Sequence, residues 1–390
     1  MGGERPSRTV GAAVIGMGWM GAVHARAYTR LRQHYPDAPL LPRLVAVADD
    51  VPGRAEQSAA QYGAERACSD WREVLADPEV DVVSVTVPNF LHREIGLAVL
   101  DAGKHLWIEK PVGLTAADAI AIAAAAEKAS LQVAVGFNYR NAPAVQAARE
   151  LIAAGEIGAV THARFRLFSD YAAHPDGALT WRYSIARGGH GVLGDLASHG
   201  VDLVRYLLGD IDSLVADAAV FIAERPEPGV ATSGHQLATG GVLGPVENED
   251  YVSAQLRLNS GARCVLEASR VSVGEQNSYG FEIHGTRGLV RWDYRRMGEL
   301  ELAVGDRFQD EPSATRFVRP GDGEFARFQP GSANPMGYDD LKVIEAARFL
   351  QSVADGAPRG AGAVDAVHSA RLLDAMVASV ESGAWVRIGS

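Results

Sequence analysis

The chain has 390 residues, of which 47% are hydrophobic and 22% are charged, and it carries a formal net charge of −11. This length predicts two globular domains, and the acidic balance argues against a nucleic-acid-binding surface, which needs clustered Lys and Arg. No apolar run approaches the length of a membrane span, and residues 1–9 lack the apolar stretch of a signal peptide. We therefore expect a cytoplasmic protein with neither a membrane nor a nucleic-acid partner.

The first predicted elements follow the order strand, glycine-rich turn, helix. An apolar run at residues 10–15 ends at a GxGxxG pattern, and a proline-free stretch at residues 20–32 has enough apolar positions for a helix. In this context the pattern is typical of a dinucleotide-binding turn, whose glycines permit a tight bend, close approach of a pyrophosphate and close helix packing. A glycine-rich turn without a ligand is the alternative. The turn residues expected to bind the cofactor are Gly16, Gly18, Trp19, Met20 and Gly21.

Acidic residues follow the second predicted strand, at residues 44–48. The carboxylate of Asp49 is placed to accept hydrogen bonds from the ribose of an adenosine and to repel a 2′-phosphate. Asp50 lies one residue further into the loop and is the weaker candidate. The two acidic residues favour NAD over NADP, although Arg54 nearby could accept a phosphate.

Three further strands are predicted at residues 80–87, 105–109 and 132–136, with helices between them. This alternation predicts an α/β domain with a doubly wound parallel sheet over residues 1–138. Polar residues follow the strands, and the carboxyl ends of parallel strands meet at the edge where such sheets bind ligands. The residues expected to contact the cofactor at this edge are Pro88, Asn89, His92, Glu109, Lys110 and Asn138.

Glu109, Lys110 and Pro111 form the most informative tripeptide of the chain. A lysine at the carboxyl end of a parallel strand lies at the ligand-binding edge of the sheet. If the glycine-rich turn holds a nicotinamide cofactor, the ammonium of Lys110 can reach the carbon–oxygen bond that gains or loses a hydride. We therefore predict that Lys110 contacts both cofactor and substrate.

Residues 139–390 predict a second, α+β domain with a large, open and mostly antiparallel sheet. Its strands are expected at residues 160–168, 214–222, 252–258, 262–269, 279–284, 289–292 and 300–304. Two long connections rich in Pro and Gly, residues 224–248 and 306–337, are interpreted as rims of a substrate pocket, as subunit contacts or as flexible segments. The helical region at residues 338–380 is expected to pack back on the first domain.

A helix over residues 195–208 carries a second group of candidate residues. Asp195 and His199 are four residues apart and would share one helix face, where a carboxylate favours the protonated form of an imidazole. The alternatives are that Asp195 is a helix N-cap and His199 a hydrogen-bonded core residue. Asp202 is either a competing partner of His199 or solvated. A zinc site of His190, Asp195 and His199 lacks a further ligand, so we expect no metal.

Together these motifs resemble the glucose–fructose oxidoreductase, inositol dehydrogenase and rhizopine-catabolism (Gfo/Idh/MocA) family. The likeness spans nearly the whole chain, and it rests on the GxGxxG turn, on residues 109–111 and 136–140, and on residues 194–199 followed by Asp202. It implies a Rossmann domain, a C-terminal domain whose open sheet forms homodimers or homotetramers, and Lys110, Asp195 and His199 as catalytic residues. Within the family, the segments most similar to levoglucosan and related glycoside 3-dehydrogenases are residues 69–71, 179–182 and 281–285.

The resemblance implies reversible oxidation of a secondary hydroxyl of a sugar, anhydrosugar, glycoside or cyclitol by hydride transfer to NAD. His199 would remove the hydroxyl proton, Asp195 would stabilise the imidazolium, and Lys110 would stabilise the oxygen; either Lys110 or His199 can be the formal base. Two alternatives are an NAD-dependent glycosidase that oxidises transiently and eliminates, and a non-catalytic NAD-binding sensor. Further candidates for substrate contacts are Asn138, Tyr139, Trp181, Arg182 and Tyr338.

Overall fold

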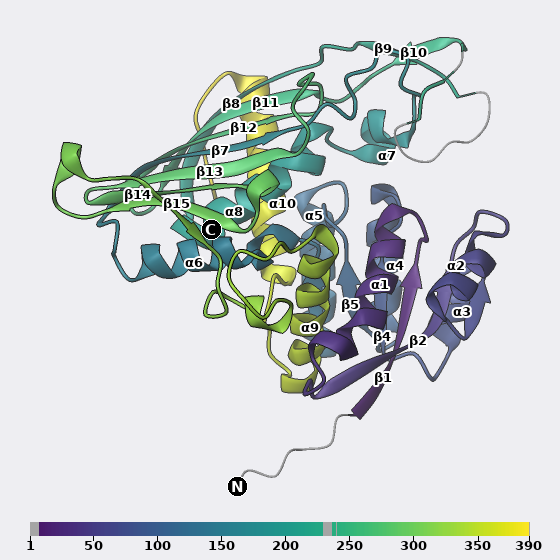
Figure 1. Ribbon diagram of the computed structural model, residues 1–390. Helices are drawn as coiled ribbons and strands as arrows, with labels where there is room; N and C mark the ends of the chain where they lie inside the picture. The colour runs from purple at the N-terminus through teal and green to yellow at the C-terminus, as the bar shows by residue number, and fades with distance from the viewer. Residues whose placement is uncertain (1–7, 229–235, 239, 390) are drawn as a thin grey trace, which may run out of the picture. The chain divides into compact units, whose positions relative to one another are not determined.

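The structure is a computed structural model that describes residues 8–228, 236–238 and 240–389 (Figure 1). Its contacts divide the chain into two compact units. The first unit comprises Met1–Asn138 and Gly337–His368, and the second comprises Tyr139–Met336 and Ser369–Ser390. No helix in the described part of the chain is long and apolar enough to cross a membrane.

A six-stranded parallel sheet forms the centre of the first unit. Its strand order, β3-β2-β1-β4-β5-β6, is that of a doubly wound Rossmann fold and confirms the predicted fold class. The strands are β1 Arg8–Ile15, β2 Leu40–Ala48, β3 Arg66–Cys68, β4 Val82–Val85, β5 His105–Ile108 and β6 Val133–Val135. The helices are α1 Trp19–His34, α2 Arg54–Tyr62, α3 Trp71–Ala76, α4 Asn89–Asp101, α5 Ala116–Ala129 and α9 Tyr338–Asp355.

Two features of this sheet differ from the sequence prediction. Strand β2 begins at Leu40 rather than at residue 44 and includes Pro42. The next strand, β3, pairs only with Ala46–Ala48, so Pro42 lies where β2 is an edge and a missing N–H is tolerated. Strand β3 has only three residues, too few for a periodic pattern to reveal.

A nine-stranded mixed sheet forms the second unit, in the order β16-β15-β14-β13-β7-β12-β11-β8-β17. Its strands are β7 Val160–Phe168, β8 Ile211–Ala219, β11 Tyr251–Leu258, β12 Arg263–Ser269, β13 Ser278–Gly285, β14 Gly288–Asp293, β15 Glu299–Val304, β16 Ala314–Phe317 and β17 Val386–Arg387. The other α-helices of the described residues are α6 Pro143–Ala153, α7 Ile185–Gly188, α8 Ser198–Leu208 and α10 Ala363–Ser382.

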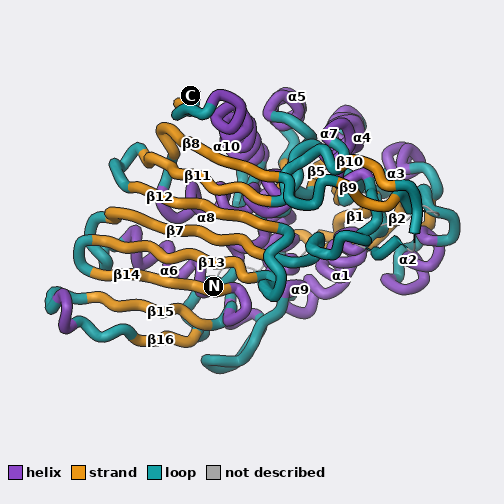
Figure 2. Tube along the Cα trace, turned by 90° about the horizontal axis from the view of Figure 1, so that it is seen from above, coloured by secondary structure: helices purple, strands orange, loops and turns teal. Residues whose placement is uncertain are grey.

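This sheet is open on one face. Buried and exposed residues alternate along β11, which is typical of a sheet with one packed and one exposed side. Figure 2 looks onto the strands, with α6 and α8 behind them. Neighbouring strands are antiparallel except β7 and β12, which run parallel, as their long connection allows.

The two long connections contain secondary structure that the sequence did not predict. In residues 224–248, β9 Glu224–Pro226 pairs with β10 Leu243–Pro245, although residues 229–235 and 239 lie outside the described chain. In residues 306–337, β16 pairs with β15 and extends the large sheet. Both connections therefore contain paired strands of the second unit.

Candidate active site

The glycine-rich turn connects β1 and α1 in the first unit. Gly16 has a φ of 92°, which favours glycine, and the hydroxyl of Thr86 donates to its carbonyl at 2.6 Å. A Cβ on Gly21 would stand 2.0 Å from that carbonyl oxygen, whereas one on Gly18 would meet no described atom within 4 Å. Gly21 therefore permits close packing, and Gly18 leaves open the backbone that a pyrophosphate would approach.

The N-terminus of α1 is available to an anion. Its N-cap is Gly18, which makes no side-chain cap, and the first turn contains no acidic residue. Free amide groups and the positive end of the helix dipole therefore suit a pyrophosphate.

Two aromatic residues of the first unit meet beside this turn. Trp19 is 70% exposed and stacks on Tyr338, the first residue of α9, with ring centroids 5.5 Å apart. The Tyr338 hydroxyl also lies 3.5 Å from the Met20 sulfur. Tyr338, a predicted substrate contact, therefore lies against the glycine-rich turn that is predicted to bind the cofactor.

Asp49 is held next to the same turn. Its Oδ2 accepts the N–H of Met17 at 2.7 Å, and its Oδ1 accepts the N–H of Val51 at 2.9 Å. The Arg54 guanidinium lies 3.3 Å from Oδ1, so the arginine considered as a phosphate ligand is paired with a carboxylate. Asp50 is exposed. These contacts leave Asp49 as the fixed acidic group at the end of β2, where NAD-binding folds place a ribose ligand.

Lys110 is the second residue after β5, and the turn that contains it is held by a histidine. His92 of α4 is buried, with Nδ1 2.8 Å from the carbonyl oxygen of Pro111 and Nε2 2.8 Å from that of Val87. Both ring nitrogens thus contact the backbone, and His92 connects the turn after β4 to the turn after β5. These contacts position the two turns, and the contact of His92 with the cofactor stays a prediction.

Asn138 fits a ligand at the end of β6. The residue is 1% exposed, and neither its Nδ2 nor its Oδ1 has a hydrogen-bond partner among the described residues. Burying an unpaired amide is costly, and the carboxamide of a nicotinamide offers both a donor and an acceptor. Pro88 and Asn89, at the start of α4, follow the carboxyl end of β4. With the open Gly18 and the uncapped α1, this edge fits NAD.

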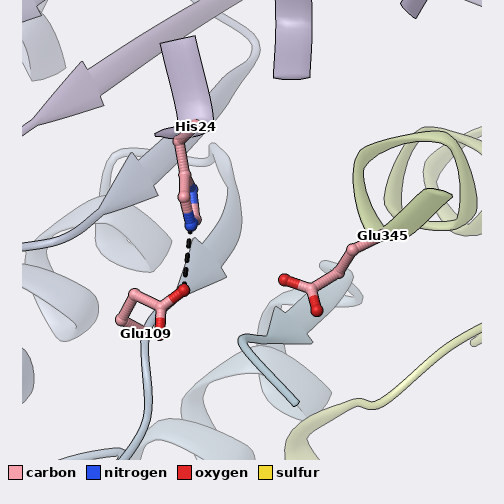
Figure 3. Close-up of side chains that lie close together, drawn as sticks. All are labelled: His24, Glu109 and Glu345. Atoms are coloured by element: carbon pink, nitrogen blue, oxygen red, sulfur yellow. Dashed lines mark hydrogen bonds and ion pairs between the residues drawn. The ribbon is translucent and has the colours of Figure 1, made fainter. Parts of the chain in front are cut away.

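Glu109 makes contacts within the first unit that the sequence did not reveal. Its Oε1 lies 3.0 Å from Nε2 of His24 and 2.5 Å from Nζ of Lys342. Figure 3 shows Glu109, His24 and Glu345 converging from the end of β5, from α1 and from α9. No local pattern connects these residues, because Glu109 and Lys342 are 233 positions apart.

The helix predicted at residues 195–208 begins as a π-helix. Leu193–Ala197 forms a π-helical turn, and α8 begins at Ser198 with Ala197 as its N-cap. Asp195 is therefore not the N-cap of this helix. The wider π turn also means that the spacing of Asp195 and His199 is not that of a continuous α-helix. Such π segments are frequent at functional sites.

Asp195 is held by a tyrosine that the sequence analysis missed. The hydroxyl of Tyr171 donates to its Oδ2 at 2.5 Å. Burial and the charge of Asp195 raise the pKa of Tyr171 well above its usual value, so this phenol keeps its proton. Burial and the charge of Asp195 also raise the pKa of Tyr279.

His199 is buried in the second unit beside another predicted site residue. Its ring lies 4.6 Å from the ring of Tyr139, which in turn packs against Tyr279 at 5.6 Å. Asp195 and His199 therefore both lie near tyrosine side chains. Aromatic faces next to a carboxylate and an imidazole suit a ring that carries hydroxyls.

Asp202 and Arg140 form a buried ion pair in the second unit. Nε of Arg140 donates to Oδ2 of Asp202 at 3.0 Å, and a second contact joins NH2 and Oδ1. The idea that Asp202 is solvated is therefore wrong. This pairing gives Arg140 a buried carboxylate partner within the second unit.

Trp181 and Arg182 lie together in a short turn of the second unit. The Arg182 guanidinium lies over the Trp181 ring, 4.5 Å from its centroid, and its Nε is buried without a hydrogen-bond partner in the described chain. The side chain of Asn248 donates to the Arg182 carbonyl at 2.8 Å. The end of the connection at residues 224–248 therefore positions this turn.

The candidate residues thus form two groups. Lys110, Asp49 and Asn138 belong to the first unit, and Asp195 and His199 belong to the second. The meeting of Lys110 with His199 around a substrate stays a prediction.

Comparison with known proteins assigns both units. The model of the oxidoreductase family with an NAD-binding Rossmann fold matches residues 10–137, and the model of the GFO/IDH/MocA C-terminal domain matches residues 145–291. Levoglucosan dehydrogenase from Pseudarthrobacter phenanthrenivorans is 34% identical over 384 residues, which are 98% of each chain. Inositol 2-dehydrogenase from Rhizobium meliloti is 29% identical over 377 residues, which cover 95% of this chain and 97% of the relative.

Solved structures agree with the sequence matches. The structure of a levoglucosan dehydrogenase in complex with NADH and levoglucosan superposes with a TM-score of 0.91 at 34% identity, covering 98% of this chain and 100% of the other. The fold, the NAD-binding turn and the full-length similarity agree with one another. The chain belongs to the Gfo/Idh/MocA family of NAD-binding oxidoreductases.

Proposed function

We propose that this protein is an NAD-dependent dehydrogenase that reversibly oxidises a secondary hydroxyl of a sugar, anhydrosugar, glycoside or cyclitol. The observation that supports it most is the full-length similarity to levoglucosan dehydrogenase, at 34% identity over 98% of both chains. This similarity covers the units that contain Lys110, Asp195 and His199. Levoglucosan is therefore the first substrate to test, and the inositols are the second.

In this proposal three side chains act on the reacting hydroxyl. Bound NAD supplies the hydride acceptor. Lys110 donates a hydrogen bond to the substrate oxygen and stabilises the negative charge that develops there. His199 accepts the hydroxyl proton, and Asp195, held by Tyr171, stabilises the resulting imidazolium.

Further side chains of the second unit support a carbohydrate rather than an apolar substrate. Tyr139 packs against His199, and Trp181 and Arg182 form a stacked pair. Aromatic faces bind the apolar face of a sugar ring, and polar groups bind its hydroxyls. The buried Nε of Arg182, which has no partner among the described residues, is a donor available to such a hydroxyl.

The test is the appearance of reduced nicotinamide with NAD, and separately with NADP, across levoglucosan, pyranoses, glycosides and inositols. We expect reduction with NAD and at least one of these substrates. Release of an aglycone without net NADH, or silence across the panel, would contradict the proposal.

Lys110→Ala tests the role of the lysine. It should lower kcat by orders of magnitude while NADH binding stays close to that of the native chain, since Lys110 acts on the reacting oxygen. The matched control is Lys128→Ala, because Lys128 is exposed near the end of α5 in the same unit. Near-native turnover of Lys110→Ala would refute the assignment.

We also propose that the exposed face of the nine-stranded sheet is a subunit interface of a homodimer or homotetramer. An open sheet with one packed face leaves a large surface for a second copy. Light scattering of the purified chain should give a multiple of the 41.4 kDa chain mass. A monomeric mass would refute this part.

A further inference from the structure

Lysine is scarce in this chain. Of its 37 Lys and Arg residues, only four are lysines: Lys104, Lys110, Lys128 and Lys342. Lys342 is one of them, and it lies on α9 with 0% of its surface exposed. A compact ammonium can donate three hydrogen bonds from one point, which an arginine fork cannot do. The contacts of the buried Lys342 ammonium therefore indicate the role of this residue.

The Lys342 ammonium joins two buried carboxylates. Its Nζ lies 2.5 Å from Oε1 of Glu109 and 2.8 Å from Oε1 of Glu345. The indole N–H of Trp107, on β5, donates to the same Glu345 oxygen at 2.8 Å. All four residues belong to the first unit.

Glu109 connects this ion pair to the backbone of Lys110. Its Oε1 contacts Lys342 and also His24, whose Nε2 is 3.0 Å away. Its Oε2 faces the peptide N–H of Lys110 at 3.3 Å. Gly136 leaves room for the carboxylate, because a Cβ there would stand 2.4 Å from Oε2. Glu109 is thus held between Lys342 and the main chain of Lys110.

His24, Glu109 and Glu345 are residue types that bind metals, but the ammonium of Lys342 already pairs with both carboxylates of this cluster. Ligand atoms of His24, Glu109 and Glu345 all lie within 4.8 Å of one another (Figure 3). Lys342 bonds both carboxylates and supplies the positive charge that a metal would bring. A metal ion bound to the same two oxygens would lie close to this ammonium and be repelled by it at low dielectric. We therefore interpret the cluster as an internal ion-pair network.

The charges of the network agree with this interpretation. Burial lowers the pKa of His24 to about 4, so this imidazole is neutral near pH 7. Burial alone would raise the pKa of Glu109, but the charge of Lys342 and the hydrogen bond from His24 outweigh it and hold that pKa below its usual range. The principal ion pair at neutral pH is therefore between Lys342 and Glu109.

We propose that Lys342 is a positioning residue for Lys110, because its buried ammonium holds the Glu109 carboxylate against the backbone N–H of Lys110 and so sets the direction of the catalytic side chain. This inference rests on the proposed function of Lys110. Lys342 is fully buried, with its ammonium bonded to Glu109 and Glu345. Its influence passes through Glu109.

The kinetic test compares Lys342→Met with Lys104→Met. Lys104 is also buried in the first unit, where its ammonium donates to the carbonyls of Asp77 and Val80. Lys342→Met should lower kcat by about 10²-fold, as expected for a small misplacement of a catalytic group, with little change in the KM for NAD. Lys104→Met should lower the melting temperature without lowering kcat. A native kcat in Lys342→Met would overturn the proposal.

A double variant separates positioning from folding. Lys342→Met leaves Glu109 as an uncompensated buried charge, so this single variant should lose stability. Lys342→Met combined with Glu109→Gln removes both charges and should recover the melting temperature but not kcat. Recovery of kcat together with stability would show that the network is only structural, and it would overturn the proposal.

A second readout does not depend on turnover. Reductive methylation with isotope-labelled formaldehyde labels only accessible lysines and the N-terminal amine, so the NMR spectrum of the labelled chain contains few signals. The signal that is missing in Lys110→Ala is the signal of Lys110. In Lys342→Met the signal of Lys110 should shift while that of Lys128 stays in place. An unshifted Lys110 signal would overturn the inference. If the native chain oxidises no substrate, the proposed function fails separately, and this spectrum still decides the positioning.

Discussion

Replacing Glu345 by Gln should change how the stability of the protein depends on pH. Glu345 is buried on α9, with Oε1 bonded to Lys342 and Oε2 without a hydrogen-bond partner among the described residues. Burial is the main cause that raises its pKa from the ordinary 4.5 to about 7; the charge of Lys342 opposes this rise, and the charge of Glu109 contributes to it. The folded chain therefore keeps a proton on this carboxyl at pH values where the unfolded chain has lost it.

The sign and size of the effect follow from linkage. Between the two pKa values the folded state binds more protons than the unfolded state, so the contribution of Glu345 is fully present below about pH 4.5 and is lost as the pH rises through about 7. At about 1.4 kcal/mol for each pH unit, the loss amounts to about 3 kcal/mol. A glutamine at this position does not titrate. The free energy of unfolding of Glu345→Gln relative to the native chain should therefore increase by about this amount with rising pH.

The assay is urea unfolding followed by far-UV circular dichroism, for both chains, from about pH 5 to about pH 8. Taking the difference between the chains cancels the titration of the groups that do not interact with Glu345. Glu127→Gln is the matched control, because Glu127 is exposed on α5 of the same unit, and its difference from the native chain should stay flat. A difference for Glu345→Gln that stays constant, or that falls with pH, would refute the assigned protonation of the network.

Three further predictions concern the candidate site. Gly18→Ala should keep the melting temperature and weaken NADH binding, since the added Cβ meets no described atom within 4 Å. Gly21→Ala should lower the melting temperature, since its Cβ would stand 2.0 Å from a carbonyl oxygen. Thermal melts and NADH titrations test both variants, and the reverse pattern would contradict the reasoning. Asn138→Ala should weaken NADH binding about tenfold without loss of stability, because its buried amide has no partner in the described chain, and an unchanged Kd would count against it. Tyr171→Phe removes a hydrogen bond to the charged Asp195, and such a hydrogen bond contributes about 1.5–3 kcal/mol. The kcat should therefore fall at least about tenfold, while the affinity for NADH stays unchanged. A native kcat would disprove that Tyr171 holds Asp195 for catalysis.

Much of the cofactor-binding half could be predicted because its information is local. The GxGxxG turn, the acidic residue at the end of β2 and Lys110 after β5 each lie at the boundary of an apolar run, and a parallel sheet brings such boundaries to one edge. Strand periodicity located seven strands of the large sheet for the same reason. The sequence analysis did not predict the short strands, because two to four residues are too few to show an alternating hydrophobic pattern. These strands are β3, β9, β10, β16 and β17.

The remaining features depend on contacts between segments far apart in the chain. The α-helical period predicts a continuous helix at residues 195–208, but tertiary packing inserts a π turn before Ser198, and Tyr171 reaches Asp195 from a segment with no periodic pattern. The ion pair between Glu109 and Lys342 joins residues 233 positions apart. The sequence by itself determined the order of elements and the residues at the sheet edge, because both follow from local hydrophobic period and chain direction. Only the tertiary structure decided which buried charges share a site, because burial and pairing depend on all the elements that pack around them.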